Sequence, residues 1–362
     1  MSANTSATGS PIAAPKLSLT DRLLPVWIIA AMAAGLGLGR AFPSLSGQLD
    51  RVRFVDVSLP VGIGLFWMMY PVLARVKYGR MTGFTSQPRL MGVSFALNWV
   101  IGPLLMFALA WLLLPDHPEY RNGVILIGLA RCIAMVLIWN MLACGDGELA
   151  ALLVALNSVF QIVFYSVFGF LFLTVVPGWL GLSKTDVDIS MWLIARNVLL
   201  FLGAPLAAGA LTRFALMRLR GAEWYDGVFA RRLAPLSLVA LLYTVVVMFI
   251  SQGDRIVDSP VDVARVALPL VIYFAVMFGS AFFVTARLGY SYETTAAVAF
   301  TAAGNNFELA IAVAIGVFGL ASGEAFAAVV GPLIEVPALL GLVYLSLWAG
   351  RRLFRSPTAA AR

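Results

Sequence analysis

Long apolar stretches recur along the 362-residue chain and alternate with short polar segments. A helix that crosses a bilayer needs about 20 mostly apolar residues. The pattern predicts ten such helices, which we place at residues 23–42, 55–74, 90–114, 122–143, 149–176, 191–212, 233–251, 263–286, 293–319 and 324–349. The segments between them are short, so no soluble domain is expected between the spans.

Composition supports lipid as the main surrounding of the chain. Hydrophobic residues make up 61% and charged residues 12%, with a mean hydropathy of +0.92. Soluble domains carry about 25% charged residues. We therefore predict an all-α integral membrane protein with one transporter-like domain over residues 21–352. Residues 1–20 lack the apolar run of a signal peptide and are expected to form a disordered cytoplasmic tail, and residues 353–362 a second one.

Basic residues give the predicted orientation. With ten spans, both termini share a side with the loops that follow the even-numbered spans. Sixteen of the 25 Lys and Arg residues fall on that side and six on the other. Cytoplasmic loops carry the basic excess, so both termini are predicted to be cytoplasmic in a multi-pass protein of the cell (inner) membrane. The net charge of +7 is then a topology signal, and no nucleic-acid partner is expected.

Ten spans divide into two sets of five, and an odd number per half means that the second half enters the membrane from the opposite side. The halves are predicted at about 21–180 and 188–350 as inverted repeats, an arrangement typical of secondary transporters. In both halves a glycine precedes a polar residue by four positions, and the next span carries an isolated polar residue. These positions are Gly128, Cys132 and Asn157 in the first half, and Gly304, Glu308 and Glu335 in the second.

Such carriers bind their substrate near the midplane of the bilayer, where interrupted helices offer free backbone groups. Non-helical backbone at that depth survives only where protein or a cavity surrounds it. We predict that the fourth and ninth spans unwind at Gly128 and at residues 304–306 and cross near the centre.

Glu308 is the first candidate for chemistry. An ionised side chain at the bilayer centre is unfavourable by about 2.5–3.5 kcal/mol on insertion scales, and intramembrane carboxylates in transporters often relay protons. Glu308 could instead be structural, pairing with Arg131 near the middle of the fourth span. Arg131 could also pair with Glu335, which lies between two prolines of the last span.

Cys132 is the second candidate. A lone cysteine in an apolar helix is often only a small hydrophobe, yet sulfur is a soft ligand that suits a thiophilic solute. Asn98, Asn157 and Asn306 could either join helices by hydrogen bonds or line a cavity. Trp139 lies seven residues after Cys132 on the same helix face, where packing is the expected role.

Enzyme chemistry finds little support. The chain has one histidine and two cysteines, so it offers neither a zinc-protease motif nor a metal-site spacing of Cys and His. We expect no cofactor and no resident metal. A membrane enzyme or a receptor remains only a distant alternative.

Four motifs carry a resemblance that covers about residues 20–352. They are "LARCIAMVLIWNMLACGD", "LNSVFQIVFYS", "NNFELAIAVAIGVFG" and "AVVGPLIEVPALLGLV". They closely resemble the arsenical-resistance family of arsenite efflux permeases, part of the bile-acid:sodium symporter superfamily. The resemblance implies ten helices and export of trivalent arsenic, in some members also antimonite, by antiport with protons.

The resemblance also implies site residues. The family's essential thiol falls on Cys132 and its essential carboxylate on Glu308. The substrate-binding set is then Cys132, Asn98, Trp139, Asn157 and Asn306, and the proton-coupling set is Glu308, Glu335 and Arg131. The fourth, fifth, ninth and tenth helices are expected to form a core that moves against the other six. A sodium-coupled organic-anion carrier of the same superfamily is the alternative.

Overall fold

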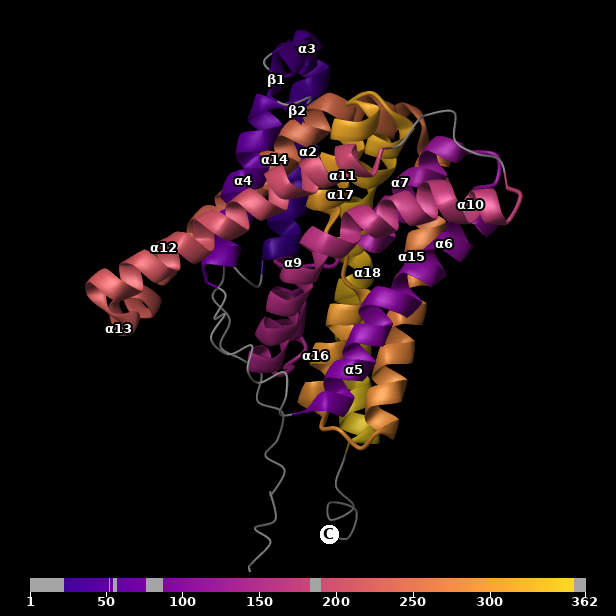
Figure 1. The fold of residues 1–362 in the computed structure, drawn as a ribbon. Coiled ribbons are helices and arrows are strands. Elements are labelled where there is room, and N and C mark those ends of the chain that lie inside the picture. The colour runs from indigo at the N-terminus through magenta and orange to yellow at the C-terminus, as the bar shows by residue number, and fades with distance from the viewer. Residues whose placement is uncertain (1–22, 52, 55–56, 76–86, 183–189, 355–362) are drawn as a thin grey trace, which may run out of the picture.

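The computed structural model describes residues 23–51, 53–54, 57–75, 87–182 and 190–354 (Figure 1). The predicted tail at 1–20 lies outside these residues, as does all of the second predicted tail except its first two residues. Leu353 still belongs to the last helix, so that helix runs slightly beyond the predicted domain boundary. Apart from one short hairpin, β1 (Arg53–Phe54) against β2 (Val57–Ser58), the regular structure described is helical.

Within the described residues, each predicted span overlaps one or more helices. In chain order the helices are α2 (Leu24–Ala41), α3 (Ser44–Arg51), α4 (Leu59–Ala74), α5 (Pro88–Ala96), η2 (Leu97–Ile101), α6 (Gly102–Leu113), α7 (Pro118–Leu129), α8 (Met135–Leu142), α9 (Gly147–Phe170), η3 (Leu171–Val175), α10 (Val176–Trp179), α11 (Met191–Val198), η4 (Leu199–Gly203), α12 (Ala204–Arg220), α13 (Ala222–Trp224), η5 (Tyr225–Phe229), α14 (Ala230–Asp258), α15 (Pro260–Arg287), α16 (Tyr292–Ala303), α17 (Phe307–Phe318) and α18 (Gly323–Leu353), where η marks a π-helical turn.

Length and composition identify membrane-crossing helices. Within the described residues, six continuous helices are long and apolar enough to cross a membrane, and three shorter apolar helices accompany them. The six are Pro88–Leu113, Gly147–Trp179, Met191–Arg220, Ala222–Gly253, Pro260–Arg287 and Gly323–Leu353. The chain is therefore an all-helical integral membrane protein, as composition predicted.

Proline explains three of the π-helical turns. Pro103, Pro177 and Pro205 each stand two residues after the last residue of such a turn. Proline has no N–H to donate, and its ring clashes with the carbonyl four residues earlier. When the turn before the proline is widened by one residue, the N–H of the residue just before the proline donates to the carbonyl five positions earlier. Gly102 donates to Leu97 in this way. The long helices thus continue through their prolines.

One group of helices, which we call the first helix group, consists of α2, α4, α12 and α14. Glycines let its backbones approach closely. A Cβ on Gly35 of α2 would lie 2.6 Å from the carbonyl oxygen of Val246 in α14, and one on Gly39 would lie 2.9 Å from that of Ile250. Contacts between small residues of this kind are the usual means of close helix association in membranes.

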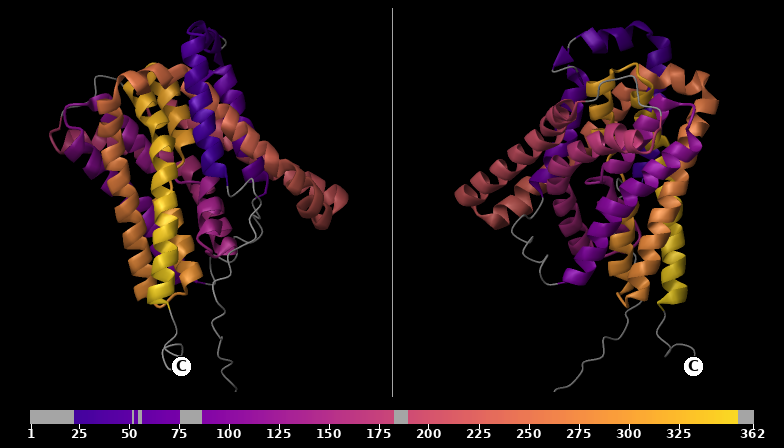
Figure 2. Two further views of the ribbon diagram at one scale, coloured as in Figure 1. Left: turned by 180° about the vertical axis from the view of Figure 1, so that it is seen from behind. Right: turned by 45° about the vertical axis from the view of Figure 1, so that its right-hand side comes forward.

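The second helix group consists of α6, α7, α8, α9, α15, α16, α17 and α18. Figure 2 shows its long helices α15 and α18 side by side, with α12 pointing away from them. The expectation that only the fourth, fifth, ninth and tenth helices form this body is wrong. The eighth helix, α15, packs along α16 and α18, and the third, through α6, packs along α7 and α15. Helix α11 contacts α9 and α17 and continues through η4 into the first group.

The close contact of α2 and α14 at Gly35 gives a stability prediction. Replacing Gly35 with leucine should lower the free energy of unfolding by about 1–3 kcal/mol, since the side chain would be forced into the α14 backbone. Thermal unfolding of the purified protein in detergent measures this loss. Gly37→Leu is the matched control, because a Cβ on Gly37 meets nothing within 4 Å. Equal stability of the two variants would contradict the packing described.

Candidate functional site at the crossing of two interrupted helices

Two helix interruptions meet inside the second helix group. Helix α7 ends at Leu129 before α8 begins at Met135, and α16 ends at Ala303 before α17 begins at Phe307. The extended residues pair as a short antiparallel bridge between Arg131 and Asn305. In the bilayer these backbone groups would otherwise lack partners, so each interruption satisfies the other.

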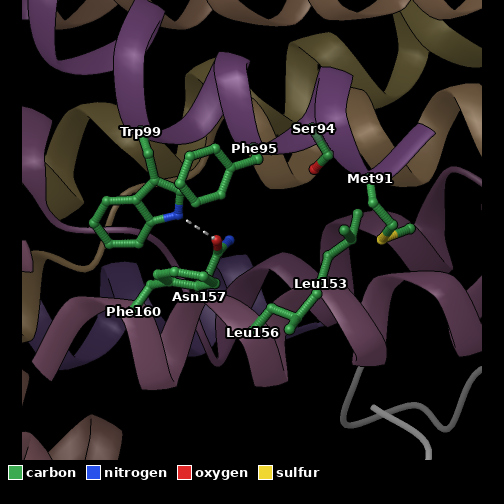
Figure 3. A pocket seen from close by; sticks show the side chains of 8 residues that line it. All are labelled: Met91, Ser94, Phe95, Trp99, Leu153, Leu156, Asn157 and Phe160. Carbon is green, nitrogen blue, oxygen red and sulfur yellow. Dashed lines mark hydrogen bonds between the residues drawn. The ribbon is translucent and has the colours of Figure 1, made fainter. Parts of the chain in front are cut away.

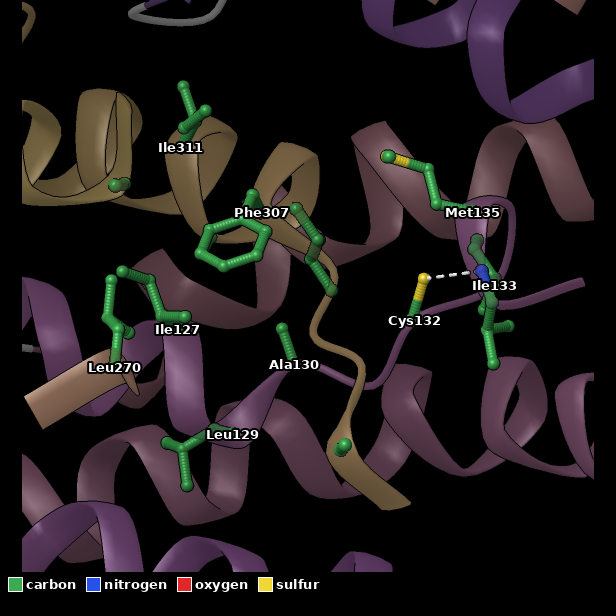
Figure 4. Packing of buried hydrophobic residues seen from close by; sticks show 14 of the residues in the cluster. Ile127, Leu129, Ala130, Cys132, Ile133, Met135, Leu270, Phe307 and Ile311 are labelled. Atoms are coloured by element: carbon green, nitrogen blue, oxygen red, sulfur yellow. Dashed lines mark hydrogen bonds between the residues drawn. The ribbon is translucent and has the colours of Figure 1, made fainter. Parts of the chain in front are cut away.

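Two backbone hydrogen bonds form this bridge. The Cys132 N–H donates to the Gly304 carbonyl at 3.2 Å, and the Asn306 N–H donates to the Ala130 carbonyl at 3.1 Å. Figure 4 shows Ala130 and Cys132 on one extended segment beside the segment that leads into Phe307. Residues 304–306 unwind where the sequence indicated.

Gly128 is not part of an interruption, contrary to expectation. It lies in the last turn of α7, and the break begins two residues later, at Ala130. The glycine is needed for close packing, since a Cβ there would collide with Met106 of α6. Gly128 therefore lies close to the break in the helix, but its role is to allow α6 to pack closely.

The asparagines of the second interruption cap helix ends. The Asn305 side-chain amide donates to the carbonyls of Ile127 at 2.9 Å and Ala130 at 3.1 Å, which stabilises the C-terminus of α7. The Asn306 side-chain oxygen accepts from the Leu309 N–H at 3.1 Å and so caps the N-terminus of α17. Asn306 is only 1% exposed.

Arg131 is fully buried and binds helix ends rather than a carboxylate. Its Nη1 donates to the Tyr273 hydroxyl at 2.7 Å and to the Ala302 carbonyl at 3.4 Å, and its Nη2 donates to the Gly128 carbonyl. Gly128 and Ala302 lie in the last turns of α7 and α16, where the helix dipoles are negative. The alternative in which Arg131 pairs with Glu308 or Glu335 is therefore wrong, since backbone and phenol acceptors take the place of a carboxylate.

Cys132 sits at the opposite kind of helix end. Its Sγ accepts a hydrogen bond from the Val136 N–H at 3.3 Å, at the N-terminus of α8, where the dipole is positive (Figure 4). The side chain is 3% exposed and packs against Gly304, whose added Cβ would lie 3.0 Å from the Cys132 Cβ. The backbone on both sides thus fixes the sulfur.

Two carboxylates lie close to this thiol. Glu308 is in the first turn of α17, and Glu335, 1% exposed, is in the middle of α18. Both are near enough to Cys132, and to each other, to interact electrostatically. Glu335 also lies beside the backbone amide of Asn305. Cys132, Asn306, Glu308 and Glu335 therefore gather around one crossing.

Glu308 faces the first helix group. It lines a narrow hollow together with Asn306 and Leu309 on the second group, and with Leu65 and Phe201 from α4 and η4. The carboxylate is thus placed at a seam between the two groups. A change in how the groups pack would change its surroundings.

The remaining predicted residues lie around the crossing rather than in it. Asn157 of α9 accepts a hydrogen bond from Trp99 Nε1 at 3.1 Å and lines a separate small hollow between α5 and α9 (Figure 3). Asn98 donates to the Ser94 carbonyl at 2.8 Å, and Trp139 is fully buried in α8.

Comparison with known proteins decides the family. The model of the sodium bile acid symporter family matches residues 62–259. The arsenical-resistance protein Acr3 of Corynebacterium glutamicum is 51% identical over 350 residues, which cover 97% of this chain and 95% of that protein. The chain belongs to the arsenical-resistance family, within the sodium bile acid symporter superfamily. The resemblance in the four motifs is confirmed.

Two further relatives span the arsenical-resistance chain almost as fully. The arsenical-resistance protein Acr3 of Alkaliphilus metalliredigens is 32% identical over 336 residues, which are 90% of this chain and 92% of that protein. An uncharacterized transporter of a Synechocystis species is 34% identical over 346 residues, or 90% and 88%. The chain is accordingly a transporter and not an enzyme.

Two residues that build the site, Gln161 and Tyr273, were not predicted from the sequence, and Asn305 was predicted only as part of the interruption and not as a cap. Gln161 of α9 accepts from the Arg131 N–H at 2.8 Å, Tyr273 accepts from its guanidinium, and Asn305 caps α7. Gln161 stands four residues after Asn157, so a shared helix face could have indicated it. Nothing in the sequence pairs Tyr273 with a residue 142 positions earlier.

The second cysteine is separate from the crossing. Cys144 lies in the turn between α8 and α9 with a φ of 57°. Partial burial and the nearby Glu293 raise the pKa of its thiol. It is a less reactive thiol than a free cysteine at neutral pH, and it offers a natural control for Cys132.

The Arg131 contacts give a second stability prediction. Tyr273→Phe should cost about 1.5–3 kcal/mol of stability, the usual worth of a hydrogen bond to a charged group. A thermal-shift measurement on the purified transporter checks the loss. Tyr344→Phe, at an α18 side chain that is 68% exposed, is the control and should change little. A Tyr273 variant as stable as this control would show that the phenol does not stabilise the guanidinium.

Proposed function

We propose that the chain exports arsenite, and also antimonite, from the cytoplasm in exchange for protons. In this proposal ten helices cross the cell (inner) membrane as inverted repeats over about 21–180 and 188–350, with both termini in the cytoplasm. The distribution of Lys and Arg supports this orientation, although several of those residues, such as Lys16 and Lys184, lie outside the described part of the chain. Two relatives named as arsenical-resistance proteins support the cargo.

One observation carries the proposal. A buried thiol lies within electrostatic range of two carboxylates at the point where two interrupted helices cross. The thiol suits a soft, thiophilic solute, and the carboxylates suit protons. Cargo and coupling ion therefore have sites close enough for each to affect the other.

The thiol step is a reversible ligand exchange. The Cys132 sulfur displaces one hydroxyl from arsenous acid and forms one S–As bond, and that hydroxyl leaves with the thiol proton as water. Water attack on arsenic reverses the step and restores the thiol. A single sulfur holds arsenic loosely enough to release it, whereas several sulfurs would trap it. The Val136 N–H keeps the sulfur oriented.

Glu308 supplies the coupling. It is deprotonated while cargo is bound and takes a proton from outside for the return step. A ligand shifts a conformational equilibrium only by binding the two states unequally. Glu308 satisfies that condition because it lies at the seam between the helix groups, where its surroundings change with state.

The other residues support these two. In the proposal Arg131 and Glu335 adjust the charge at the crossing, and Asn306 holds the start of α17. Asn98, Asn157 and Trp139 complete the substrate-binding set, of which Asn157 lines the hollow between α5 and α9.

A sodium-coupled organic-anion carrier is the second candidate, because the matching family model takes its name from sodium and bile acids. Proteoliposomes containing the purified protein separate the two. Arsenite flux that follows an imposed pH gradient and is unaffected by a sodium gradient supports the proposal. Flux that requires sodium, or none with arsenite at any pH gradient, overturns it.

Cys132→Ser tests the thiol. Serine keeps the size of the side chain but offers a hard oxygen, so arsenite flux should fall to the level of empty liposomes. Cys144→Ser is the control and should retain wild-type flux. If Cys132→Ser transported at the wild-type rate, the sulfur would be only a packing group.

Glu308→Gln tests the coupling. The neutral amide cannot exchange a proton, so net export against an arsenite gradient should stop while arsenite binding survives. Binding is measured by calorimetry and export by flux in proteoliposomes. Glu293→Gln, at an exposed carboxylate of α16, is the control. Normal pH-driven export by the Glu308 variant would remove this residue from the coupling.

A further inference from the structure

The two helix groups are tied together by side chains at one end of the bundle. Helix α14 of the first group reaches the turn that joins α17 to α18 of the second group. Arg255 Nη1 donates to the carbonyls of Ala321 at 3.0 Å and Ser322 at 3.4 Å. Gln252, three residues earlier on α14, donates its Nε2 to the Leu320 carbonyl. Three successive carbonyls are thus held from across the seam.

Aromatic rings on the second group strengthen this contact. The Arg255 guanidinium lies 4.9 Å from the ring centroid of Phe326 in α18 and 5.9 Å from that of Tyr120 in α7. A cation over an aromatic face is attracted by the ring quadrupole. Because the turn follows the C-terminus of α17, its carbonyls also lie at the negative end of that helix dipole. One side chain of α14 therefore contacts α7, α18 and the turn.

The turn is shaped to present these carbonyls. Gly319 ends α17 with a φ of 95°, a conformation that side-chain-bearing residues rarely adopt. The segment then passes through Leu320 and Ala321 to Ser322, whose hydroxyl accepts from the Ala325 N–H at 3.1 Å and caps α18. Helices α17 and α18 thus fix the turn at both ends, while α14 contacts it only through side chains.

Hydrogen bonds at the opposite end of the bundle join helices of the same group. The Tyr225 hydroxyl donates to the Ala74 carbonyl at 2.8 Å within the first group. The Tyr292 hydroxyl donates to the Ala143 carbonyl at 2.7 Å within the second. The tie made by Arg255 is of another kind, because it crosses the seam.

We propose that Arg255 and Gln252 form an outer latch, which closes the transporter on the outside and must open before cargo leaves. The latch rests on the proposed function, which places this end of the bundle outside. Its bonds run from two side chains to backbone carbonyls and can break without disturbing either helix group. Arg255 and Gln252 are therefore residues of the transport cycle that the crossing does not contain.

Accessibility of a buried cysteine tests the latch. Asn197 is fully buried against Gly316 of α17, on helix α11, which leads from the second group through η4 into the first. Asn197→Cys, in a Cys144→Ser background, reports on that contact when intact cells are treated with a membrane-impermeant maleimide and the modification at position 197 is measured by mass spectrometry of the peptides, apart from that at Cys132. Adding Arg255→Ala should make labelling about tenfold faster, equivalent to about 1.4 kcal/mol toward the outward-open state. Gln252→Ala should give a smaller increase in the same direction.

Arg51→Ala is the matched control. Arg51 is an exposed arginine in the last turn of α3, at the same end of the bundle (Figure 1). Its loss should leave labelling unchanged. If the latch variants label no faster than the reporter alone, or if Arg51→Ala accelerates labelling equally, the latch is overturned. Should Arg255→Ala fail to reach the membrane, the Gln252→Ala result decides.

The labelling needs no arsenite, so the two proposals can fail separately. Faster labelling in a protein that does not transport arsenite would support the latch and overturn the cargo assignment. Unchanged labelling in a protein that exports arsenite normally would overturn the latch and leave the export proposal standing.

Discussion

The structure depends on two interrupted helices whose freed backbone N–H and C=O groups form hydrogen bonds with each other. In a bilayer an interrupted helix has no water to hydrogen-bond its freed N–H and C=O groups. Here the bridge between Arg131 and Asn305 pairs them, and the Asn305 side chain caps α7. Four helix ends then converge, and charge is distributed among them by sign. The guanidinium of Arg131 lies at the C-termini of α7 and α16, whereas the sulfur of Cys132 and the carboxylate of Glu308 lie at the N-termini of α8 and α17.

This arrangement explains which parts of the site could be predicted. Gly304 and two asparagines in an apolar stretch are unfavourable for a helix, so the second interruption was visible in the sequence. The first interruption begins two residues later than predicted, because Gly128 allows close packing against Met106 and does not unwind the helix. The partner of Arg131 could not be predicted. A charge count offers only carboxylates, whereas backbone carbonyls at two helix ends and a phenol satisfy this guanidinium.

Helix positions were predictable for a different reason than helix partners. Spans follow from apolar length, which the bilayer sets. Which helices pack together depends in part on how closely their backbones can approach, and at Gly35 a single Cβ would collide with α14. A Cβ on Gly37, two residues later, would meet nothing, so the sequence alone does not distinguish a glycine needed for packing from one that is not. Apolar length likewise does not show which helices α15 packs against. Its boundaries were therefore nearly correct, whereas its helix group was predicted wrongly.

In the proposed cycle the crossing must stay intact while the two helix groups move, and two arginines illustrate how this chain could separate those requirements. Arg131 is completely buried, and its acceptors on α7, α15 and α16 belong to one helix group, so motion between groups leaves its bonds unstretched. Arg255 belongs to the other group and donates to a turn across the seam, so the same motion must break its bonds. A buried charge whose partner is removed is strongly destabilised. Such a charge is therefore suited to holding the crossing together, whereas a cation at a helix end, near water, is suited to a contact that opens in every cycle.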